Sequence, residues 1–288
     1  MKGPLTRMRN LKTGLRRIAH AVPGGSASWK ALAKLRRRTP KPGFSGWEMT
    51  THALPPWAGG GDELASEFLG VDQAFRELVK SGEFVLTQRL GETNRQVWLD
   101  ELMWRHYIVF WSVRFAARNT ICKPKNLVEC GVCDGMSSYF AMRAVEDDYQ
   151  FKSYLYDAWE AMDAEDLLES EKGHAGEYNY LDVRNTQRNL EKFKANAILI
   201  KGRVPATFHS SPCPDELVWM HIDLNAALPT TAALDHYFDR LAPGGIVLLD
   251  DYGWRDYYDT KLAVDHFFEG KPGMLFCLPT GQAAYFKH

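Results

Sequence analysis

Three acidic residues stand directly after two apolar segments of the chain, where their side chains could do chemistry together. Asp223 follows residues 218–222, and Asp250 and Asp251 follow residues 245–249. If both segments are neighbouring parallel strands, their carboxyl ends meet at one edge of the sheet, where ligands bind in open α/β sheets. Carboxylates so close repel each other unless a cation compensates, and oxygen ligands suit Mg²⁺ or a similar divalent ion. We therefore predict that the three residues bind a metal; the alternative is that Asp250 caps the next loop and the others are solvated.

Asp223 is also the candidate catalytic base. A divalent cation could hold two substrate oxygens and lower the pKa of a hydroxyl group. A carboxylate beside that hydroxyl could then take its proton. Asp223 is therefore expected to have a catalytic role as well as a metal-binding one.

A glycine-containing turn between a short apolar run and a helical pattern predicts a second site. Its spacing is Glu129-x-Gly131-x-x-x-Gly135, followed by Ser137. Dinucleotide-binding loops and P-loops have a different spacing. A glutamate in the turn would repel a phosphate but suits a cation, and S-adenosylmethionine (SAM) carries a sulfonium and an ammonium. The turn, with Glu129, Gly131 and Gly135, is therefore predicted to bind SAM, although a plain tight turn between strand and helix has the same appearance.

The next acidic strand end supports a nucleoside ligand. Asp157 ends the segment Tyr-Leu-Tyr-Asp, where a carboxylate can accept hydrogen bonds from two ribose hydroxyls. This does not separate SAM from NAD, and a solvated loop carboxylate is the alternative. Gly202 stands at the end of the following strand and is a weaker candidate for the same cofactor site.

Alternating apolar segments and helical patterns from residue 126 onward predict an α/β fold with a mostly parallel sheet. Helical periodicity also predicts two preceding helices, at about residues 62–84 and 95–118, the second rich in aromatic residues. Further helices are expected at Ser137–Val145, Val183–Phe193, Thr230–Leu241 and Asp259–Phe268. The expected strands are Leu127–Glu129, Ser153–Tyr156, Ala197–Ile200, Val218–Ile222, Gly245–Leu249 and an antiparallel pair, Met274–Leu278 with Ala283–Phe286.

Charge and composition divide the chain into four segments. Every charge from residue 1 to residue 41 is basic, although the net charge of the whole chain is −1. We predict a basic and flexible arm (1–45), a Pro/Gly linker (46–61), a helical lid or dimerisation segment (62–125) and a SAM-binding domain (126–288). The arm could contact an anionic surface, and the alternative is a solvated leader.

The remaining features predict a cytoplasmic protein. No apolar run approaches the roughly 20 residues that span a bilayer. Five scattered cysteines indicate reduced thiols, and Cys130 and Cys133 have no second pair at zinc spacing. A net charge near zero gives no reason to expect nucleic-acid binding. A homodimer is compatible with the aromatic helix.

Several of these segments resemble the macrocin O-methyltransferase family, whose members include sugar O-methyltransferases of the mycinamicin and novobiocin pathways. The likeness covers about residues 95–288. It is carried by Val128-Glu-Cys-Gly-Val-Cys-Asp-Gly-Met-Ser137, His221-Ile-Asp-Leu-Asn225, Thr230-Thr-Ala-Ala-Leu234, Leu241-Ala-Pro-Gly-Gly-Ile-Val-Leu-Leu-Asp-Asp-Tyr-Gly253 and Ala263-Val-Asp-His-Phe-Phe268.

The resemblance implies a Rossmann-like class I methyltransferase fold and Mg²⁺-dependent transfer of a methyl group from SAM to a sugar hydroxyl. The family's metal ligands fall on Asp223, Asp250 and Asp251. Its SAM contacts fall on the glycine-turn residues named above, on Asp157 and, less securely, on Gly202.

Departures from the family pattern lie on the acceptor side. The usual Asp-Leu-Asp-Leu-Tyr is Asp223-Leu-Asn-Ala-Ala227, the usual Asp-Ser/Thr-Phe-Glu-Gly is Asp157-Ala-Trp-Glu-Ala161, and Gly-Gly-Ser is Gly135-Met-Ser137. The acceptor, a small molecule or a glycan, is therefore left open, and five nearby residues are candidates to stack on it: Trp159, His221, Trp254, Tyr257 and Tyr258. A second hypothesis also stays open, that of an inactive binding or regulatory protein docked through its basic arm.

Overall fold

A computed structural model of the chain describes residues 63–87 and 92–288. The predicted basic arm (1–45) and the predicted linker (46–61) lie outside the described residues. The described part is built around a single sheet.

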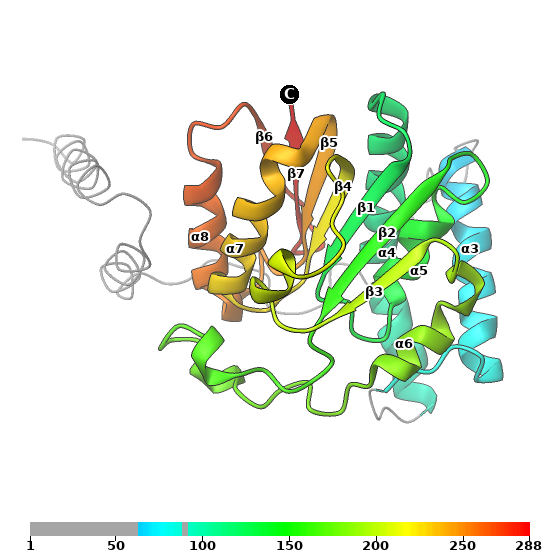
Figure 1. Cartoon of the computed structure of the whole chain (residues 1–288). Helices are drawn as coiled ribbons and strands as arrows, with labels where there is room; N and C mark the ends of the chain where they lie inside the picture. The colour runs from blue at the N-terminus through cyan, green and yellow to red at the C-terminus, as the bar shows by residue number, and fades with distance from the viewer. Residues whose placement is uncertain (1–62, 88–91) are drawn as a thin grey trace, which may run out of the picture. The chain divides into compact units, whose positions relative to one another are not determined.

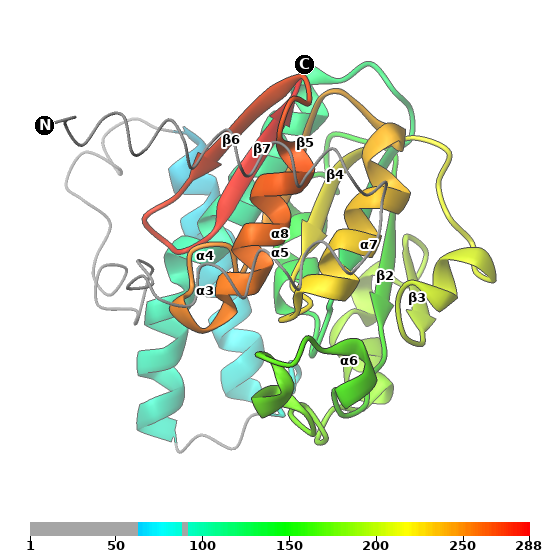
Figure 2. The same cartoon turned by 90° about the vertical axis from the view of Figure 1, so that its left-hand side faces the viewer.

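Seven strands form this sheet, with the order β3-β2-β1-β4-β5-β7-β6. The strands β1 to β5 all run parallel to one another, and β7 is antiparallel to both of its neighbours, β5 and β6. Figure 2 shows the antiparallel pair at one edge. The strands are β1 (Lys125–Cys130), β2 (Phe151–Asp157), β3 (Ala197–Lys201), β4 (Leu217–Ile222), β5 (Leu241–Leu249), β6 (Gly273–Cys277) and β7 (Ala283–Lys287).

Helices cover both faces of the sheet, which explains why its central strands are apolar on both sides. In Figures 1 and 2, α7 and α8 lie on one face, and α3, α4 and α5 lie on the other. Within the described residues no helix is long and apolar enough to cross a membrane. The helices are α3 (Glu63–Ser81), α4 (Glu92–Asn119), α5 (Met136–Arg143), α6 (Val183–Asn189), α7 (Ala227–Tyr237) and α8 (Tyr258–Phe268).

The two helices that precede the sheet belong to the same core as the sheet. Phe68 of α3 and Phe110 of α4 are fully buried, and they lie in one apolar cluster with Leu127 of β1 and Trp219 of β4. The segment that we expected as a lid or dimerisation element (62–125) is thus packed into the domain, and α4 covers β4 and β5.

The predicted fold is confirmed, and most helix and strand ends lie within about three residues of the prediction, with larger differences around α6, α7 and β5. The helix expected at Thr230–Leu241 begins earlier, at Ala227. Pro229 is tolerated in the first turn of this helix because backbone N–H groups there have no partner within the helix. Leu241, which was expected at the end of that helix, opens β5 instead. The helix expected at Val183–Phe193 breaks at Leu190 and continues as a 3₁₀ turn.

Candidate active site

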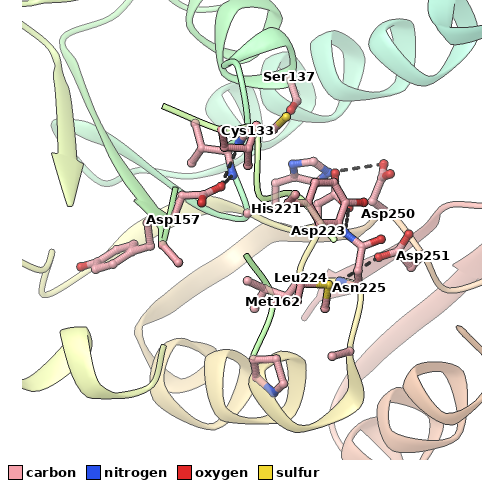
Figure 3. A pocket seen from close by; sticks show the side chains of 18 of the residues that line it. Cys133, Ser137, Asp157, Met162, His221, Asp223, Leu224, Asn225, Asp250 and Asp251 are labelled. Atoms are coloured by element: carbon pink, nitrogen blue, oxygen red, sulfur yellow. Dashed lines mark hydrogen bonds and ion pairs between the residues drawn. The ribbon is translucent and has the colours of Figure 1, made fainter. Parts of the chain in front are cut away.

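A cavity of about 440 Å³ lies at the carboxyl ends of the parallel strands. Its wall combines the glycine turn after β1, the ends of β2 to β5, one side of α4 and the long connection between β2 and α6. Most of the predicted site residues line it: Gly131, Ser137, Asp157, Gly202, Asp223, Asp250 and Asp251. Figure 3 shows Asp157, Asp223, Asp250 and Asp251 at strand ends and Ser137 at the start of α5, all around a common space.

The glycine turn is held close to the end of β4. Gly131 has a φ of +89°, and a Cβ atom there would lie 1.9 Å from the backbone oxygen of Asp223. No side chain fits such a position, so the turn requires glycine. Its backbone N–H donates to Tyr156 at 2.8 Å, which fixes the turn between β2 and β4.

Asp157 holds the turn in place as well as lining the cavity. One carboxylate oxygen accepts hydrogen bonds from the backbone N–H groups of Val132 (2.7 Å) and Cys133 (2.8 Å), and the other accepts from that of Trp159 (2.6 Å). Burial raises the pKa of Asp157, and these hydrogen bonds counteract the rise. A carboxylate with two oxygens can accept about four hydrogen bonds, so acceptor capacity remains for a ligand hydroxyl.

Two of the predicted cofactor residues stand behind the cavity wall. Glu129 is 1% exposed, and its carboxylate accepts hydrogen bonds from Ser138 and from Nδ1 of His221, the latter at 2.9 Å. Gly135 is the N-cap of α5 and has a φ of +88°, and a Cβ atom there would press against the side chains of Leu190 and Thr186. Both residues shape the site from behind, and the cavity lining excludes them.

The three predicted metal-binding residues do converge. Asp223, Asp250 and Asp251 each offer a carboxylate oxygen, and these oxygens lie within 4.8 Å of one another. The backbone hydrogen bonds between the strands continue one residue beyond the ends of β4 and β5. Asp223 N–H donates to Cys130 O, and Asp250 N–H donates to Ile222 O. Strand register therefore sets the positions of the carboxylates.

Arg105 of α4 compensates part of this negative charge. It is 4% exposed, forms an ion pair with the Asp250 carboxylate and donates to the backbone oxygens of Asp250 and Thr280. Gln282 donates to Asp250 Oδ1 at 2.8 Å. Asn225 contacts the other two acids, with its backbone N–H 3.2 Å from Asp251 Oδ2 and its amide 3.5 Å from Asp223 Oδ1.

Burial changes the proton affinity of this group. It raises the pKa of Asp223, and the positive charge of Arg105 acts in the opposite direction. It raises the pKa of Asp251 well above the ordinary range, and the neighbouring Asp223 adds to the rise. The pKa of Arg105 falls to about 10 because of burial, yet the guanidinium stays charged at neutral pH. Such shifts are typical of sites that bind a cation or transfer a proton.

The connection between β2 and α6, residues 158–182, closes the acceptor side. It contributes Met162, Tyr178 and Leu181 to the lining, and Tyr178 faces the acids closely enough that their charges help burial to raise its pKa. Two backbone hydrogen bonds hold the two halves of the loop together: Met162 N–H donates to Glu177 O and Gly176 N–H donates to Met162 O, both at 2.9 Å. It forms an ordered cover over that side.

A buried glutamate fastens this loop to the sheet. Glu171 is 2% exposed, and its two carboxylate oxygens accept the backbone N–H groups of Leu168 and Ala227, both at 2.9 Å. Ala227 is the first residue of α7, two residues after Asn225. Glu171 thereby ties the loop to the segment that carries Asp223.

Of the five aromatic residues and histidines predicted near the acceptor, three line the cavity: His221, Trp254 and Tyr257. Trp159 is buried and donates from its indole N–H to Cys133 O (3.0 Å) and Thr186 Oγ1 (2.8 Å), so it supports the turn. Tyr258 lies outside the lining.

Sequence reasoning missed Arg105, Gln282, Tyr178 and Glu171. Arg105 had a detectable signal, because it falls on the same helical stripe as Trp98, Leu102 and Val109, all of which line the cavity. A charged residue on an apolar stripe is a candidate for a buried ion pair. The other three stand in loops without a periodic pattern.

Comparisons with known proteins agree with this geometry. Residues 128–252 match a family model described as a methyltransferase domain. No protein of curated function matches the sequence significantly. The solved structure of the O-methyltransferase NovP matches with a TM-score of 0.55 and 19% identity, covering 64% of this chain and 80% of that one.

Two further structures match at lower TM-scores. The calicheamicin methyltransferase CalS11 gives 0.49 at 16% identity, covering 86% of this chain and 99% of that one. The precorrin-6y C5,15-methyltransferase from Geobacter metallireducens GS-15 gives 0.44 at 13% identity, covering 72% and 95%. Residues 128–252 thus match a methyltransferase domain, and the sheet that contains them has the class I methyltransferase fold.

Proposed function

We propose that this protein transfers a methyl group from SAM to a hydroxyl of a sugar or another polyhydroxyl acceptor, with the help of a divalent cation such as Mg²⁺. The observation that carries the proposal is the convergence of Asp223, Asp250 and Asp251 within 4.8 Å on the cavity wall. Neighbouring hydroxyls of a small molecule or glycan suit such a site, because two oxygens can share one cation.

The charge of the cavity favours SAM over a phosphorylated cofactor. Nine acidic residues and two arginines line it. Both arginines are paired with acids, Arg105 with Asp250 and Arg203 with Glu160 and Asp163. Gly131, Ser137, Asp157 and Gly202 would hold the cofactor. When bound, SAM supplies a methyl group on a sulfonium, which is already an electrophile.

The carboxylate set fits a divalent cation. Asp223, Asp250 and Asp251 carry three negative charges, and Arg105 offsets one of them. Two negative charges remain, which a divalent ion would neutralise. When bound, such an ion supplies Lewis acidity that lowers the pKa of an acceptor hydroxyl.

The chain's own residues then position the acceptor and receive its proton. The Asp223 carboxylate accepts the proton, and its raised pKa brings its proton affinity closer to that of the group it deprotonates. Arg105 and Gln282 keep Asp250 in a fixed orientation. Tyr178 and Tyr257 cover the acids and exclude water from that end of the cavity.

Binding measurements separate the cofactor site from the catalytic group. We expect Asp223→Asn to bind S-adenosylhomocysteine (SAH) with the wild-type affinity and to lose at least about 100-fold in methyl transfer, as expected when a general base is removed. The matched control is Asp215→Asn, because Asp215 is an exposed acid two residues before the start of β4. This variant should keep full activity.

Cation dependence needs its own test on the wild-type protein. Methyl transfer to a panel of sugars and glycosides, followed by mass spectrometry, should require Mg²⁺ or a related ion and stop with EDTA. Asp250→Ala should weaken the effect of Mg²⁺ on SAH calorimetry. Full activity in EDTA would defeat the metal part of the proposal, because Arg105 alone would then compensate the acids.

A further inference from the structure

His221 occupies a rigid position on β4 directly beside Glu129. The two residues are register partners on the neighbouring strands β1 and β4, and each is 1% exposed. The imidazole stacks on Trp219, with ring centroids 5.6 Å apart and an interplanar angle of 23°. Trp219 is itself fixed by a 2.9 Å hydrogen bond to Ser112 of α4. The ring therefore has one orientation.

The hydrogen bonds around Glu129 determine which nitrogen of His221 carries a proton. The Ser138 hydroxyl donates to one oxygen of Glu129, and Nδ1 of His221 lies 2.9 Å from the other. An ionised carboxylate only accepts hydrogen bonds, so Nδ1 must be the donor. In a neutral imidazole the second nitrogen, Nε2, then presents a lone pair.

The lone pair on His221 Nε2 points toward the three carboxylates, and none of them donates a hydrogen bond to it. His221 lines the cavity, and within the described residues Nε2 is buried without a hydrogen-bond partner. Asp250 Oδ1 lies 3.5 Å away, too far for a charge-assisted hydrogen bond of about 2.7–2.9 Å. Figure 3 shows the imidazole turned toward Asp250, beside Asp223.

A cation between the Nε2 lone pair and Asp250 Oδ1 would satisfy both atoms. Gln282 already donates one N–H to Asp250 Oδ1, and Arg105 pairs with the carboxylate. An oxygen has two lone pairs, so Oδ1 retains one for a further partner. A spacing of 3.5 Å between nitrogen and oxygen matches two ligands at about 2.1 Å from one ion in near-tetrahedral geometry.

We propose that His221 Nε2 is a ligand of the divalent cation, together with Asp223, Asp250 and Asp251, and that Glu129 and Ser138 are positioning residues behind it. This inference rests on the proposed cation dependence. A histidine ligand whose other N–H donates to a carboxylate is a common way to fix the tautomer and raise ligand basicity. Imidazole suits first-row transition metals, whereas Mg²⁺ strongly favours oxygen. The site should therefore prefer Mn²⁺ to Mg²⁺.

The test compares metal binding in two variants that differ at the relevant atom. In His221→Asn the amide nitrogen can occupy the place of Nδ1 and keep the bond to Glu129, while Nε2 is lost. In His236→Asn, a control on α7, the substituted ring lies outside the cavity lining. The full-length proteins are titrated with Mn²⁺ and with Mg²⁺ by calorimetry in the presence of SAH. The visible absorption of added Co²⁺ reports whether nitrogen is bound.

The expected result is a loss of about 10- to 100-fold in Mn²⁺ affinity in His221→Asn, with a smaller change for Mg²⁺ and an altered Co²⁺ spectrum. His236→Asn should behave as wild type. SAH affinity and circular dichroism, unchanged in all three proteins, show that the fold is intact. Glu129→Gln, which weakens the support of the ring, should give an intermediate loss.

Two outcomes would overturn the inference, and they differ in what else they reject. If His221→Asn keeps the wild-type ratio of Mn²⁺ to Mg²⁺ affinity and the same Co²⁺ spectrum, His221 is no ligand, and the three carboxylates bind the ion without it. If the wild-type protein with SAH binds none of the three ions, the proposed cation dependence fails with it.

Discussion

Replacing Glu171 by glutamine tests whether this residue fastens the loop over the active site. The side chain is 2% exposed and accepts one backbone N–H from Leu168 and one from Ala227, both at 2.9 Å. Glutamine has the same shape, but its amide offers one accepting oxygen. Whichever way it is placed, its NH₂ group faces a backbone donor.

The size of the effect follows from these contacts. A hydrogen bond to a charged group contributes about 1.5–3 kcal/mol, and a buried donor left without a partner costs about 1–3 kcal/mol. We therefore expect Glu171→Gln to destabilise the loop by about 2 kcal/mol, which changes an opening equilibrium by about 30-fold. If the loop unfolds only with the whole domain, the melting temperature should fall by about 4–8 °C.

Hydrogen exchange distinguishes these possibilities. The backbone N–H groups of Met162 and Gly176 bond within the loop, so their exchange reports its opening. The matched control is Glu169→Gln, because Glu169 is exposed in the same loop and forms a surface ion pair with Lys172 at 2.8 Å. Surface pairs contribute about 0–1 kcal/mol, so the control should resemble wild type.

The result that would refute this reasoning is equality of the two variants. If Glu171→Gln and Glu169→Gln show the same exchange in residues 158–182 and the same melting temperature, the loop is held by other contacts. SAH affinity should stay unchanged in Glu171→Gln, since the glycine turn is fastened separately by Asp157.

Three further predictions concern the turn and the acids. Gly131→Ala places a Cβ 1.9 Å from the Asp223 backbone oxygen at a φ of +89°, so it should cost about 2 kcal/mol or more in urea unfolding and weaken SAH binding in calorimetry; wild-type values would show that the turn can move. Trp159→Phe loses the hydrogen bonds to Cys133 and Thr186, so the free energy of unfolding in urea should fall by about 1–3 kcal/mol. An unchanged free energy of unfolding would show that water takes the place of the indole N–H. The raised pKa values of Asp223 and Asp251 give stability that is present at low pH and is lost as pH rises through those values, while a cation binds the charged forms. Added Mg²⁺ should therefore raise the melting temperature more at about pH 8 than at about pH 5, and an equal rise at both would contradict the assignment.

The positions of the strand ends were enough to predict that the three acids lie close together, because this depends on topology alone. Parallel strands bring their carboxyl ends to one edge, so Asp223 and the Asp250–Asp251 pair had to approach each other once β4 and β5 were neighbours. The same logic places Asp157 on the cavity wall, but it gives no information about hydrogen-bond partners. The three backbone N–H groups that Asp157 accepts belong to the turn geometry, which a sequence pattern does not specify.

Contacts across long stretches of chain limited the prediction further. Arg105 meets Asp250 across 145 residues, and a single sequence carries no signal for which buried acid a helix arginine will reach. Glu129 was predicted to touch the cofactor because of its place in the turn. Its side chain faces His221 instead, since register pairs the two residues on the same face of the sheet.

Under the proposed cation dependence, the electrostatics of the three acids explain how the site can be stable in the folded protein and still have affinity for a cation. Asp250 is neutralised and oriented by Arg105 and Gln282, so it is fixed before any ligand arrives. Asp223, which is half-buried, and Asp251, which is buried, remain as a pair whose pKa values are raised by desolvation, and Asp251 is affected further by Asp223. The repulsion within this pair lowers the free energy of unfolding of the protein, and a bound divalent ion would raise it again. A second arginine beside Asp223 and Asp251 would neutralise their charge and remove that cost. It would also remove most of the affinity for a cation. Because Arg105 offsets only one of the three negative charges, the arrangement favours a site that binds a divalent ion.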